Sequence, residues 1–472
     1  MHWLLLCGIY GLLLVRAILD FQPLWDFLTY HLPAALKVVG KTTYDLQELY
    51  AEFIKGCPPL GHLIQAALIA VTGNIASSQL FSFVSLIVSL IGIKQMYRER
   101  ISVRWLATSF LGIPLFILLL PTGYLDIGVA TGLLLSFAAL LHLDGGGKLG
   151  PSVAWYLAGM AFSFGGKFQA WPFAAIFSAG LVIVLAKRFL SRRESWKSSL
   201  LATVLVALFL GLWPIRNIVK FGNPTYPVQP PFIKTELNSP HPSSGGIEEW
   251  LGPEGLEGRP RPVKFLLSTF ELTRWQNSET PFHYNWDMTD YPEGRASPHW
   301  RMGGWFFVPM LTGCTLLVLA IVSGAAPRIS LVMLALAMLL TALSPASNYL
   351  RFWSFIPLCL LFIVVFTQDH YGNRFGLLIR IVLCVSAIYS VASTWTPPAQ
   401  WHPLEATIPP GAREFWKEFR KNGYSREKPV YLGESVTPFG IYYAGRNFNK
   451  LPVTQDPRDE SARTDVPIPP PW

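Results

Sequence analysis

Long apolar runs recur along most of the chain, and the charged side chains are concentrated in the shorter segments between them. A helix of about 20 apolar residues is long enough to cross the hydrocarbon core of a bilayer. The first run has no small-residue cleavage site after it, so we expect a retained anchor rather than a signal peptide. The pattern predicts about eleven spans, at residues 3–19, 77–96, 105–121, 126–142, 152–164, 169–187, 198–215, 303–323, 329–343, 352–366 and 376–393.

Lysine and arginine residues are concentrated in alternate loops, and such residues favour the cytoplasmic side of a membrane. The basic residues that set the orientation are Lys94, Arg98, Arg100, Arg104, Lys148, Lys187, Arg188, Arg192, Arg193, Lys197, Arg328 and Arg374. With these in the cytoplasm and the spans alternating, the outer side receives residues 20–76, 122–125, 165–168, 216–302, 344–351 and the tail from about 394.

Residues 60–72 are apolar but short. If this segment crossed the membrane fully, the basic cluster from Lys94 to Arg104 would face outward. We therefore expect a re-entrant or interfacial helix at 60–72. The alternative is a pair of crossings, with a further span elsewhere that the apolar pattern does not reveal.

The composition fits a polytopic membrane protein. Hydrophobic residues make up 51% of the chain and charged residues 14%, against about 25% charged residues in a typical globular domain. This excludes a soluble enzyme, a disordered chain and a secreted disulfide scaffold. The net charge of +9 is explained by the basic loops and does not indicate nucleic-acid binding. We expect an all-α transmembrane domain at 1–395 and an extracytoplasmic tail at 396–472, in which 411–450 forms a small α/β unit beginning with the strand PVYLGESV.

Several ionisable residues fall where a membrane protein rarely carries them without a function. Asp26 and His31 lie in the first outer loop, Asp126 opens a span, Lys167 occupies a short turn, and Arg351 begins a late span. The predicted topology places all of them on the outer side, although they come from four separate regions of the chain. An acid, a histidine-bearing loop and two cations gathered there would suit a phosphorylated lipid.

Each of these residues also has a purely structural interpretation. Asp26 could pair with a nearby cation, and His31 beside Tyr30 could be an ordinary interfacial histidine. Asp126 could cap its helix, where the dipole favours an acid. Lys167 and Arg351 could extend toward the headgroups as membrane anchors. The sequence alone leaves these alternatives open.

The motifs that carry these residues resemble, in order, those of bacterial GT-C integral-membrane glycosyltransferases of the protein mannosyltransferase and aminoarabinose transferase group. The similarity covers residues 1–395. It comprises WDFLTYHLPAAL with Asp26, Tyr30 and His31; PTGYLDIGVATGLLLSFAAL with Asp126; FSFGGKFQA with Lys167; RNIVKFGNPTYP from Arg216 to Pro227; and YLRFWSFIPLCLL with Arg351. Many relatives carry two adjacent acids in the first loop, whereas Trp25 and Phe27 flank a single Asp26 here, so a metal site built on an acid pair is not expected. Asp20, Asp45 and Glu48 are the alternative acids of that loop.

The resemblance implies a GT-C-like bundle in the bacterial inner membrane that transfers a sugar from a polyprenyl phosphate to a glycolipid, polysaccharide or protein outside the cytoplasm. It implies Asp26 as the general base of an inverting displacement, and Lys167 and Arg351 as cations for the leaving phosphate. Asp126 would orient a cation or bind sugar hydroxyls, and Tyr30 and His31 would position the donor or acceptor. No cofactor is certain, although a divalent cation is compatible with this chemistry. The competing classes are a transporter or flippase for a lipid-linked sugar and a non-catalytic membrane subunit of a larger complex.

Overall fold

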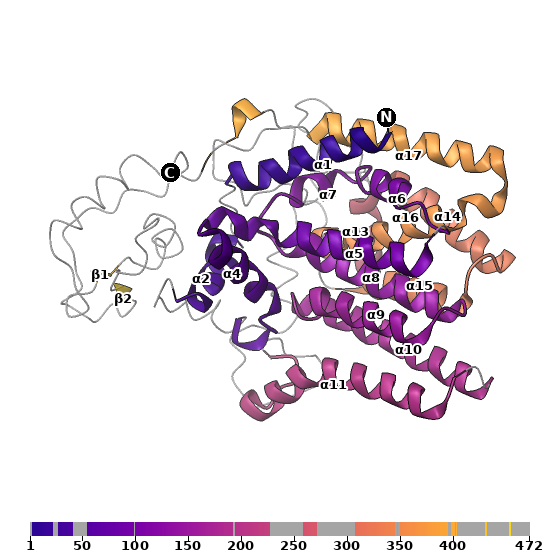
Figure 1. Cartoon of the computed structure of the whole chain (residues 1–472), viewed down its shortest axis with the longest axis horizontal. Coiled ribbons are helices and arrows are strands. Elements are labelled where there is room, and N and C mark those ends of the chain that lie inside the picture. Colours follow the sequence, from indigo (N-terminus) through magenta and orange to yellow (C-terminus); the bar gives the residue numbers. More distant parts are fainter. Residues whose placement is uncertain are drawn as a thin grey trace.

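The computed structural model describes residues 2–21, 27–40, 54–98, 100–191, 194–226, 258–270, 307–344, 347, 350–394, 398–401, 403, 430–431 and 453–454. Within these ranges the chain forms a bundle of helices that run roughly alongside one another (Figure 1). The protein is therefore an all-α polytopic membrane protein, as the apolar pattern predicts.

Among the described residues, seven helical segments are long and apolar enough to cross a membrane. They contain α1 (His2–Leu19), η2 (Ile75–Leu80) with α5 (Phe81–Tyr97), α8 (Asp126–Asp144), η3 (Phe168–Ala170) with α10 (Trp171–Leu190), α11 (Trp196–Phe221), η5 (Leu350–Trp353) with α16 (Phe355–Thr367), and α17 (Asn373–Thr394). Three shorter helices also match predicted spans: α9 (Leu149–Ser163), α14 (Phe307–Ser323) and α15 (Arg328–Leu343).

The predicted span at 105–121 is wrong as a single helix. The chain there forms α6 (Val103–Phe110) and α7 (Pro114–Leu119), with a break between them. Ile113 is extended, with φ −111° and ψ 105°, because a residue that precedes proline is disfavoured in the helical region. Helix α17 packs against the break, where the Ser386 hydroxyl donates to the Gly112 carbonyl at 3.2 Å.

Helix α8 is the central helix of the bundle, and nearly all of it is buried. It packs against α5, α9, α10, α15 and α16. The closest approach is to α9, where Gly132 and Gly159 face each other: a Cβ on Gly132 would lie 2.7 Å from the Gly159 carbonyl oxygen. Small residues let two helix backbones approach within van der Waals contact, which is a common way of packing helices in membranes.

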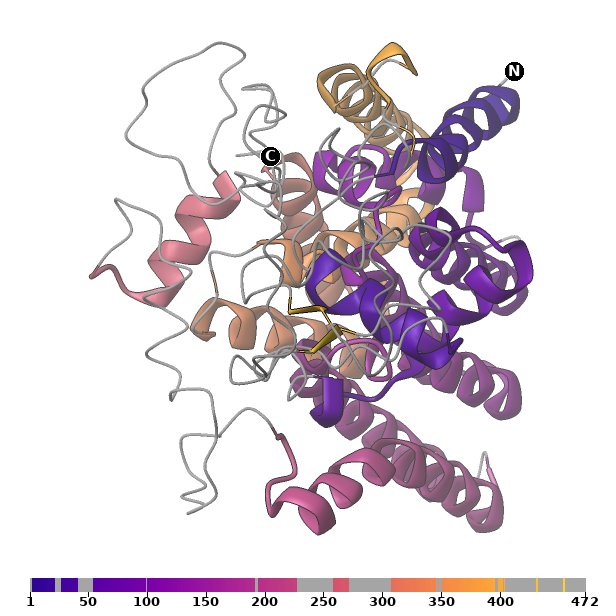
Figure 2. The ribbon, with the colours of Figure 1, turned by 90° about the vertical axis from the view of Figure 1, so that its left-hand side faces the viewer.

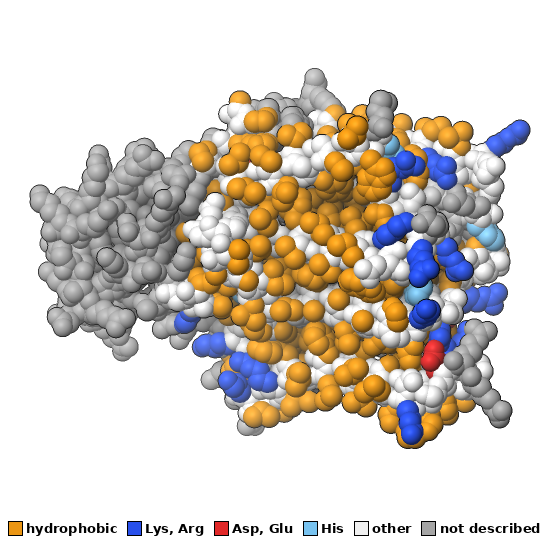
Figure 3. Space-filling view, viewed as in Figure 1, with side chains coloured by type: hydrophobic (Ala, Val, Ile, Leu, Met, Phe, Trp, Pro, Cys, Tyr) orange, Lys and Arg blue, Asp and Glu red, His pale blue; other side chains and the backbone are white. Residues whose placement is uncertain are grey.

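The two ends of the bundle differ in charge. Figure 3 shows an apolar band across the middle, a smaller group of Lys and Arg side chains near one end, and most of the Lys and Arg side chains in view at the other end. We call the end with most of these side chains the basic end. There Arg188 donates to the Leu143 carbonyl at 2.9 Å, and Lys187 lies 3.9 Å from Asp144. We call the opposite end, where α8 begins at Asp126, the site end.

Helix α4 (Leu60–Thr72) lies at the site end and does not cross the bundle (Figures 1 and 2). Its 13 residues span about 20 Å, which is less than the hydrocarbon thickness of about 30 Å. After a left-handed Gly73 the chain folds back through η2, and the Gln65 amide donates to the Ser78 carbonyl at 3.3 Å and to the Gly123 carbonyl at 3.0 Å. The segment 60–72 is thus a short helix at the site end, and its re-entrant or interfacial position in the membrane stays a prediction.

The remaining described elements are short. They are η1 (Phe27–His31), α2 (Leu32–Val38), α13 (Arg261–Phe270), η6 (Gln368–Tyr371), η7 (Pro398–Gln400), β1 (Val430–Tyr431) and β2 (Val453–Thr454). The two strands pair in parallel, so the predicted strand PVYLGESV contains β1. The rest of the predicted 411–450 unit lies outside the described residues. Within the long loop 216–302, α13 is attached to the end of α15, because Arg261 donates to the Leu343 carbonyl at 3.3 Å.

Candidate functional site

A buried ion pair joins the start of α8 to the turn after α9. The Lys167 ammonium nitrogen lies 3.0 Å from each carboxylate oxygen of Asp126. The side chains of Lys167 and Asp126 are only 7% and 2% exposed. A charged pair this deeply buried is costly unless the geometry is good and the charges are matched, so the pair indicates a specific role at this position.

The local sequence explains why the two groups meet. The contact of Gly132 with Gly159 brings α8 and α9 together as neighbours. The chain then turns through Gly165 and Gly166, where a Cβ would lie 2.4 Å from a backbone oxygen at either position. The amide of Gly61 in α4 donates to the Gly165 carbonyl at 3.4 Å and closes this turn from the outside. Lys167 is thereby presented to the first turn of α8.

Asp126 is not a helix cap in the structure. The N-cap position is Leu125, and no side chain caps this helix end. The Asp126 carboxylate instead accepts both bonds from Lys167 while it occupies the first turn, where the helix dipole stabilises a negative charge. The capping interpretation of Asp126 is therefore wrong, because its side chain accepts no hydrogen bond from the helix end. Its hydrogen bonds instead orient the Lys167 ammonium.

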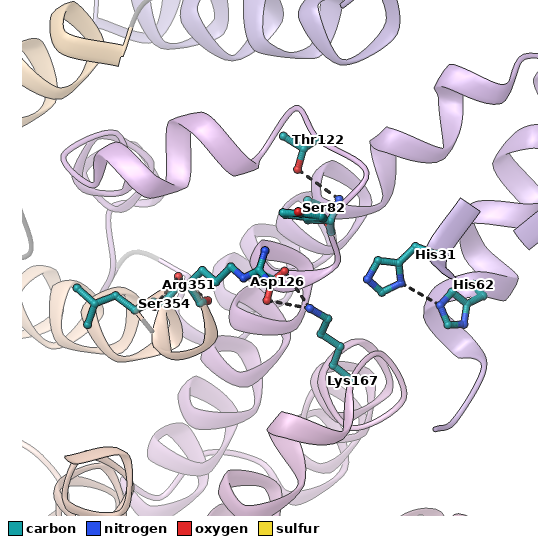
Figure 4. A network of polar contacts seen from close by, with 10 residues as sticks. His31, His62, Ser82, Thr122, Asp126, Lys167, Arg351 and Ser354 are labelled. Atoms are coloured by element: carbon teal, nitrogen blue, oxygen red, sulfur yellow. Dashed lines mark hydrogen bonds and ion pairs between the residues drawn. The ribbon is translucent and has the colours of Figure 1, made fainter. Parts of the chain in front are cut away.

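Arg351 adds a second cation. It lies in η5 at the start of α16, and its guanidinium carbon is 4.8 Å from the ring centre of Tyr124 and 5.2 Å from that of Phe352. The Lys167 ammonium is 5.5 Å from the same Phe352 ring. Figure 4 shows the Arg351 side chain pointing toward Asp126. Cations over aromatic faces are stabilised electrostatically, so Phe352 supports both positive groups at once.

A pair of buried histidines completes the described site. His31, at the end of η1, and His62, in α4, are 1% and 4% exposed. Their rings share a hydrogen bond of 3.0 Å between Nδ1 of His31 and Nε2 of His62 (Figure 4). The sequence prediction missed His62, although an ionisable residue inside the apolar run 60–72 is itself a signal of function.

The surroundings of these histidines favour their neutral forms. Burial, followed by His62 and the charges of Lys167 and Arg351, holds the pKa of His31 well below its ordinary value. Burial, followed by Lys167, lowers the pKa of His62 to about 4. Since both cations act on His31, the imidazole belongs to the same electrostatic environment as the ion pair.

Of the two remaining predicted site residues, the structure describes Tyr30 but not Asp26. Tyr30 is half-buried, and its ring centre lies 4.2 Å from that of His31. Asp26, the predicted catalytic residue, lies outside the described residues. Its neighbour Phe27 is fully buried against Gly123, where a Cβ would lie 2.1 Å from the Phe27 ring. The structure therefore brings together His31, Tyr30, Asp126, Lys167 and Arg351, while the role of Asp26 stays a prediction.

Metal binding has no candidate among the residues that the structure describes. Those residues contain no group of three or more His, Cys, Asp or Glu side chains that could hold a metal ion. The other first-loop acids, Asp45 and Glu48, lie outside the described ranges, as Asp26 does, whereas Asp20 forms a buried ion pair of 3.0 Å with Arg16.

No protein-family model matches the chain, and no curated protein sequence matches it. Two solved structures resemble it in fold, both crystal structures of ArnT from Cupriavidus metallidurans. The one bound to undecaprenyl phosphate is 12% identical, with a TM-score of 0.42 over 93% of this chain and 84% of that one. The apo structure is 14% identical, with a TM-score of 0.39 over 93% and 83% of the two chains. The function proposed below is based on the side chains of the site, because a likeness at this level is too distant to carry it.

Proposed function

We propose that the protein is a membrane glycosyltransferase that moves a sugar from a polyprenyl-phosphate donor to an acceptor at the non-cytoplasmic face. The observation that supports this most is the buried Asp126–Lys167 pair with Arg351 beside it at the site end. Departure of a lipid phosphate from the sugar builds negative charge on a phosphate oxygen. Fixed cations aimed at that oxygen stabilise the transition state.

The two cations have different tasks in this proposal. Arg351 binds phosphate with its planar donor fork, and Lys167 contributes a compact point charge. Lys167 has three N–H groups, of which two can serve Asp126 and one remains for the phosphate. Asp126 then acts as a positioning residue, because it fixes the Lys167 ammonium in one place and offsets its charge.

Asp26 is proposed as the general base that removes the proton from the acceptor hydroxyl. Its neighbour in the chain, Phe27, packs on Gly123, three residues before Asp126 in the sequence. This contact places the start of η1 near the cation site, which supports a part for the adjoining Asp26 in the reaction. Direct attack of the acceptor on the anomeric carbon would invert its configuration. Tyr30 would line the same region and help to position the donor or acceptor.

The orientation follows from the charge asymmetry of the bundle. Basic residues favour the cytoplasm, so the basic end is proposed to face inward and the site end and C-terminal tail outward. Apolar side chains are exposed along α1, α11 and α17, as is expected of surfaces that face lipid. Leu4, Val219 and Ile388, for example, are 69–80% exposed. The location of the site near one end also favours an enzyme over a transporter, whose ionisable groups are expected near the bilayer midplane.

The test is transfer by the purified protein in lipid nanodiscs. Undecaprenyl-phosphate hexoses are supplied as donors with a cell-envelope extract as the source of acceptor, and the release of undecaprenyl phosphate is measured. Asp26→Asn should abolish release, and Asp45→Asn, an isosteric change at another acid of the same loop, should leave most of it. Full activity of Asp26→Asn would remove Asp26 from the mechanism. Absence of release by the unmodified protein with every donor would contradict the proposed function.

A further inference from the structure

The His31–His62 pair lies beside Lys167 and Arg351, the cations that we propose bind phosphate. The resemblance implies a positioning role for His31, but no step described so far uses the protons of this pair. His31 Nδ1 is bonded to His62, but His31 Nε2 is buried and has no hydrogen-bond partner among the residues that the structure describes. Figure 4 shows the His31 ring between His62 and the group formed by Asp126, Lys167 and Arg351. A buried polar atom without a partner is costly, and this one faces the group that we propose binds phosphate.

The hydrogen bond between the two rings limits how many protons they can hold. At 3.0 Å between Nδ1 and Nε2, a single proton lies between the rings. If both imidazoles were charged, two N–H groups would face each other and the bond would be lost. The pair can therefore be neutral or carry one extra proton.

The singly charged pair has one arrangement of protons, whichever ring receives the proton. Both outer nitrogens, Nε2 of His31 and Nδ1 of His62, then carry hydrogens, and one proton stays between the rings. In the charged pair, His31 always presents an Nε2–H toward the cation group. In the neutral pair it does so in only one of the two tautomers. A negatively charged oxygen there would select this donor form.

Glycosyl transfer from a phosphodiester changes the charge at the site. The bond between the anomeric carbon and the phosphate oxygen breaks, and its electron pair stays on that oxygen. The phosphate passes from one negative charge to two, and the acceptor hydroxyl loses a proton as its oxygen bonds to the anomeric carbon. One proton and one additional negative charge therefore appear together within the site.

We propose that His31 and His62 act as a single proton store, which takes up this proton and places it on His31 Nε2 against the new phosphate dianion. The inference rests on the proposed function, because it needs a lipid phosphate between Lys167 and Arg351. His31 and His62 are positioning residues in this scheme, and Asp26 remains the group that first removes the proton. The positive charge on the histidine pair then balances the second negative charge of the phosphate product.

The charged groups around His31 make the store respond to phosphate. Lys167 and Arg351 disfavour a proton on His31, Asp126 partly offsets Lys167, and the neutral phenol of Tyr30 adds no charge. Burial, followed by His62 and these two cations, holds the pKa of His31 well below its ordinary value. One negative charge at about 4 Å and an effective dielectric constant of about 20 shifts a protonation equilibrium about a thousandfold. A phosphate dianion beside His31 therefore opposes the effect of the two cations and favours the protonated pair.

The test measures proton uptake when the product binds. Undecaprenyl phosphate is titrated into the purified protein in nanodiscs at pH 7.5 by calorimetry, in buffers that differ in ionisation enthalpy. At this pH a phosphomonoester, with a second pKa of about 6, is already mostly dianionic. Proton uptake on binding therefore reports the protein and not the phosphate. We expect uptake that approaches one proton per protein, and loss of the uptake in His31→Gln and in His62→Gln while binding is retained.

The matched control is His142→Gln at the basic end, where His142 bonds to Ser152 at 2.8 Å; it should leave the uptake unchanged. Binding without proton uptake, or uptake that persists in both His31→Gln and His62→Gln, overturns the proton store and leaves the proposed function standing. Failure of the unmodified protein to bind undecaprenyl phosphate overturns both. If His31→Gln does not yield folded protein, His62→Gln alone decides between these outcomes, because it breaks the same bond from the other side.

Discussion

Replacing Lys167 by Met tests whether the Asp126–Lys167 pair is buried as the structure describes. At 3.0 Å and an effective dielectric constant of about 20, two unit charges attract by about 5 kcal/mol. Removing one partner of a buried pair typically costs about 3–5 kcal/mol, because the other charge is left without compensation. We expect Lys167→Met and Asp126→Asn each to lower the free energy of unfolding by an amount in this range.

The double variant Asp126→Asn/Lys167→Met separates the value of the pair from the cost of a stranded charge. With both charges removed, the remaining cost should be about 1–3 kcal/mol, the ordinary penalty for a buried amide that lacks full hydrogen bonding. The double variant should therefore be more stable than either single one, although it should bind no lipid phosphate. Such non-additivity is expected only for residues in direct contact.

The measurement is reversible unfolding in mixed micelles with increasing fractions of SDS. Lys187→Met is the matched control. Lys187 also faces a buried aspartate, Asp144, whose side chain is 2% exposed, but the two lie 3.9 Å apart and the Lys187 side chain is 64% exposed. Asp144 also accepts hydrogen bonds from the amide and hydroxyl of Ser330. Because the Lys187 ammonium is solvated and Asp144 keeps its bonds from Ser330, this variant should cost much less than Lys167→Met. If Lys167→Met costs no more than Lys187→Met, the buried pair and the site built on it are refuted.

Two further predictions concern the phosphate contact and the packing that supports it. Arg351→Ala should weaken undecaprenyl phosphate binding by about 10- to 100-fold, the range for a charge-assisted hydrogen bond. The control Arg328→Ala should leave binding unchanged. If a calorimetric titration shows equal effects of the two variants, Arg351 does not belong to the site. Gly132→Ala should lower the free energy of unfolding by about 1–3 kcal/mol, because its Cβ would lie 2.7 Å from the Gly159 carbonyl and 2.9 Å from the Ser163 amide. Gly8→Ala in α1, which has open space around it, is the control, and an equally stable Gly132→Ala protein would contradict the close packing of α8 on α9.

Much of the bundle could be predicted because span length and loop charge are local properties of the sequence. Ten of the predicted spans each correspond to one helical segment of the described residues, where η2 with α5, η3 with α10 and η5 with α16 count as one segment each. The short apolar segment at 60–72 lies at one end. The span at 105–121 failed because apolar content does not report backbone continuity. The signal for its break was present in Gly112 and Pro114, since proline restrains the residue before it.

The site was predicted only in outline. The predicted alternation of spans was enough to place Asp126, Lys167 and Arg351 at one end of the bundle, because each lies next to a predicted membrane boundary on the outer side. Their contact depends on the α8–α9 packing and on how α16 enters the bundle, which no local pattern encodes. His62 was missed for a similar reason: its partner His31 is 31 residues away, and the two meet only because α4 folds back at the site end.

The charges of the described site can be set against those of the proposed reaction. Asp126, Lys167 and Arg351 together carry one net positive charge, which matches the single negative charge of a phosphodiester donor. The product, a phosphate monoester, carries two, so the cations alone would leave one charge unmatched in a buried environment, where such a charge is costly. One proton on the His31–His62 pair supplies the missing charge, and transfer to the acceptor releases one proton. This balance explains why a neutral histidine pair, rather than a third fixed cation, would lie beside the site: a permanent third charge would bind the product more tightly than the donor and slow its release.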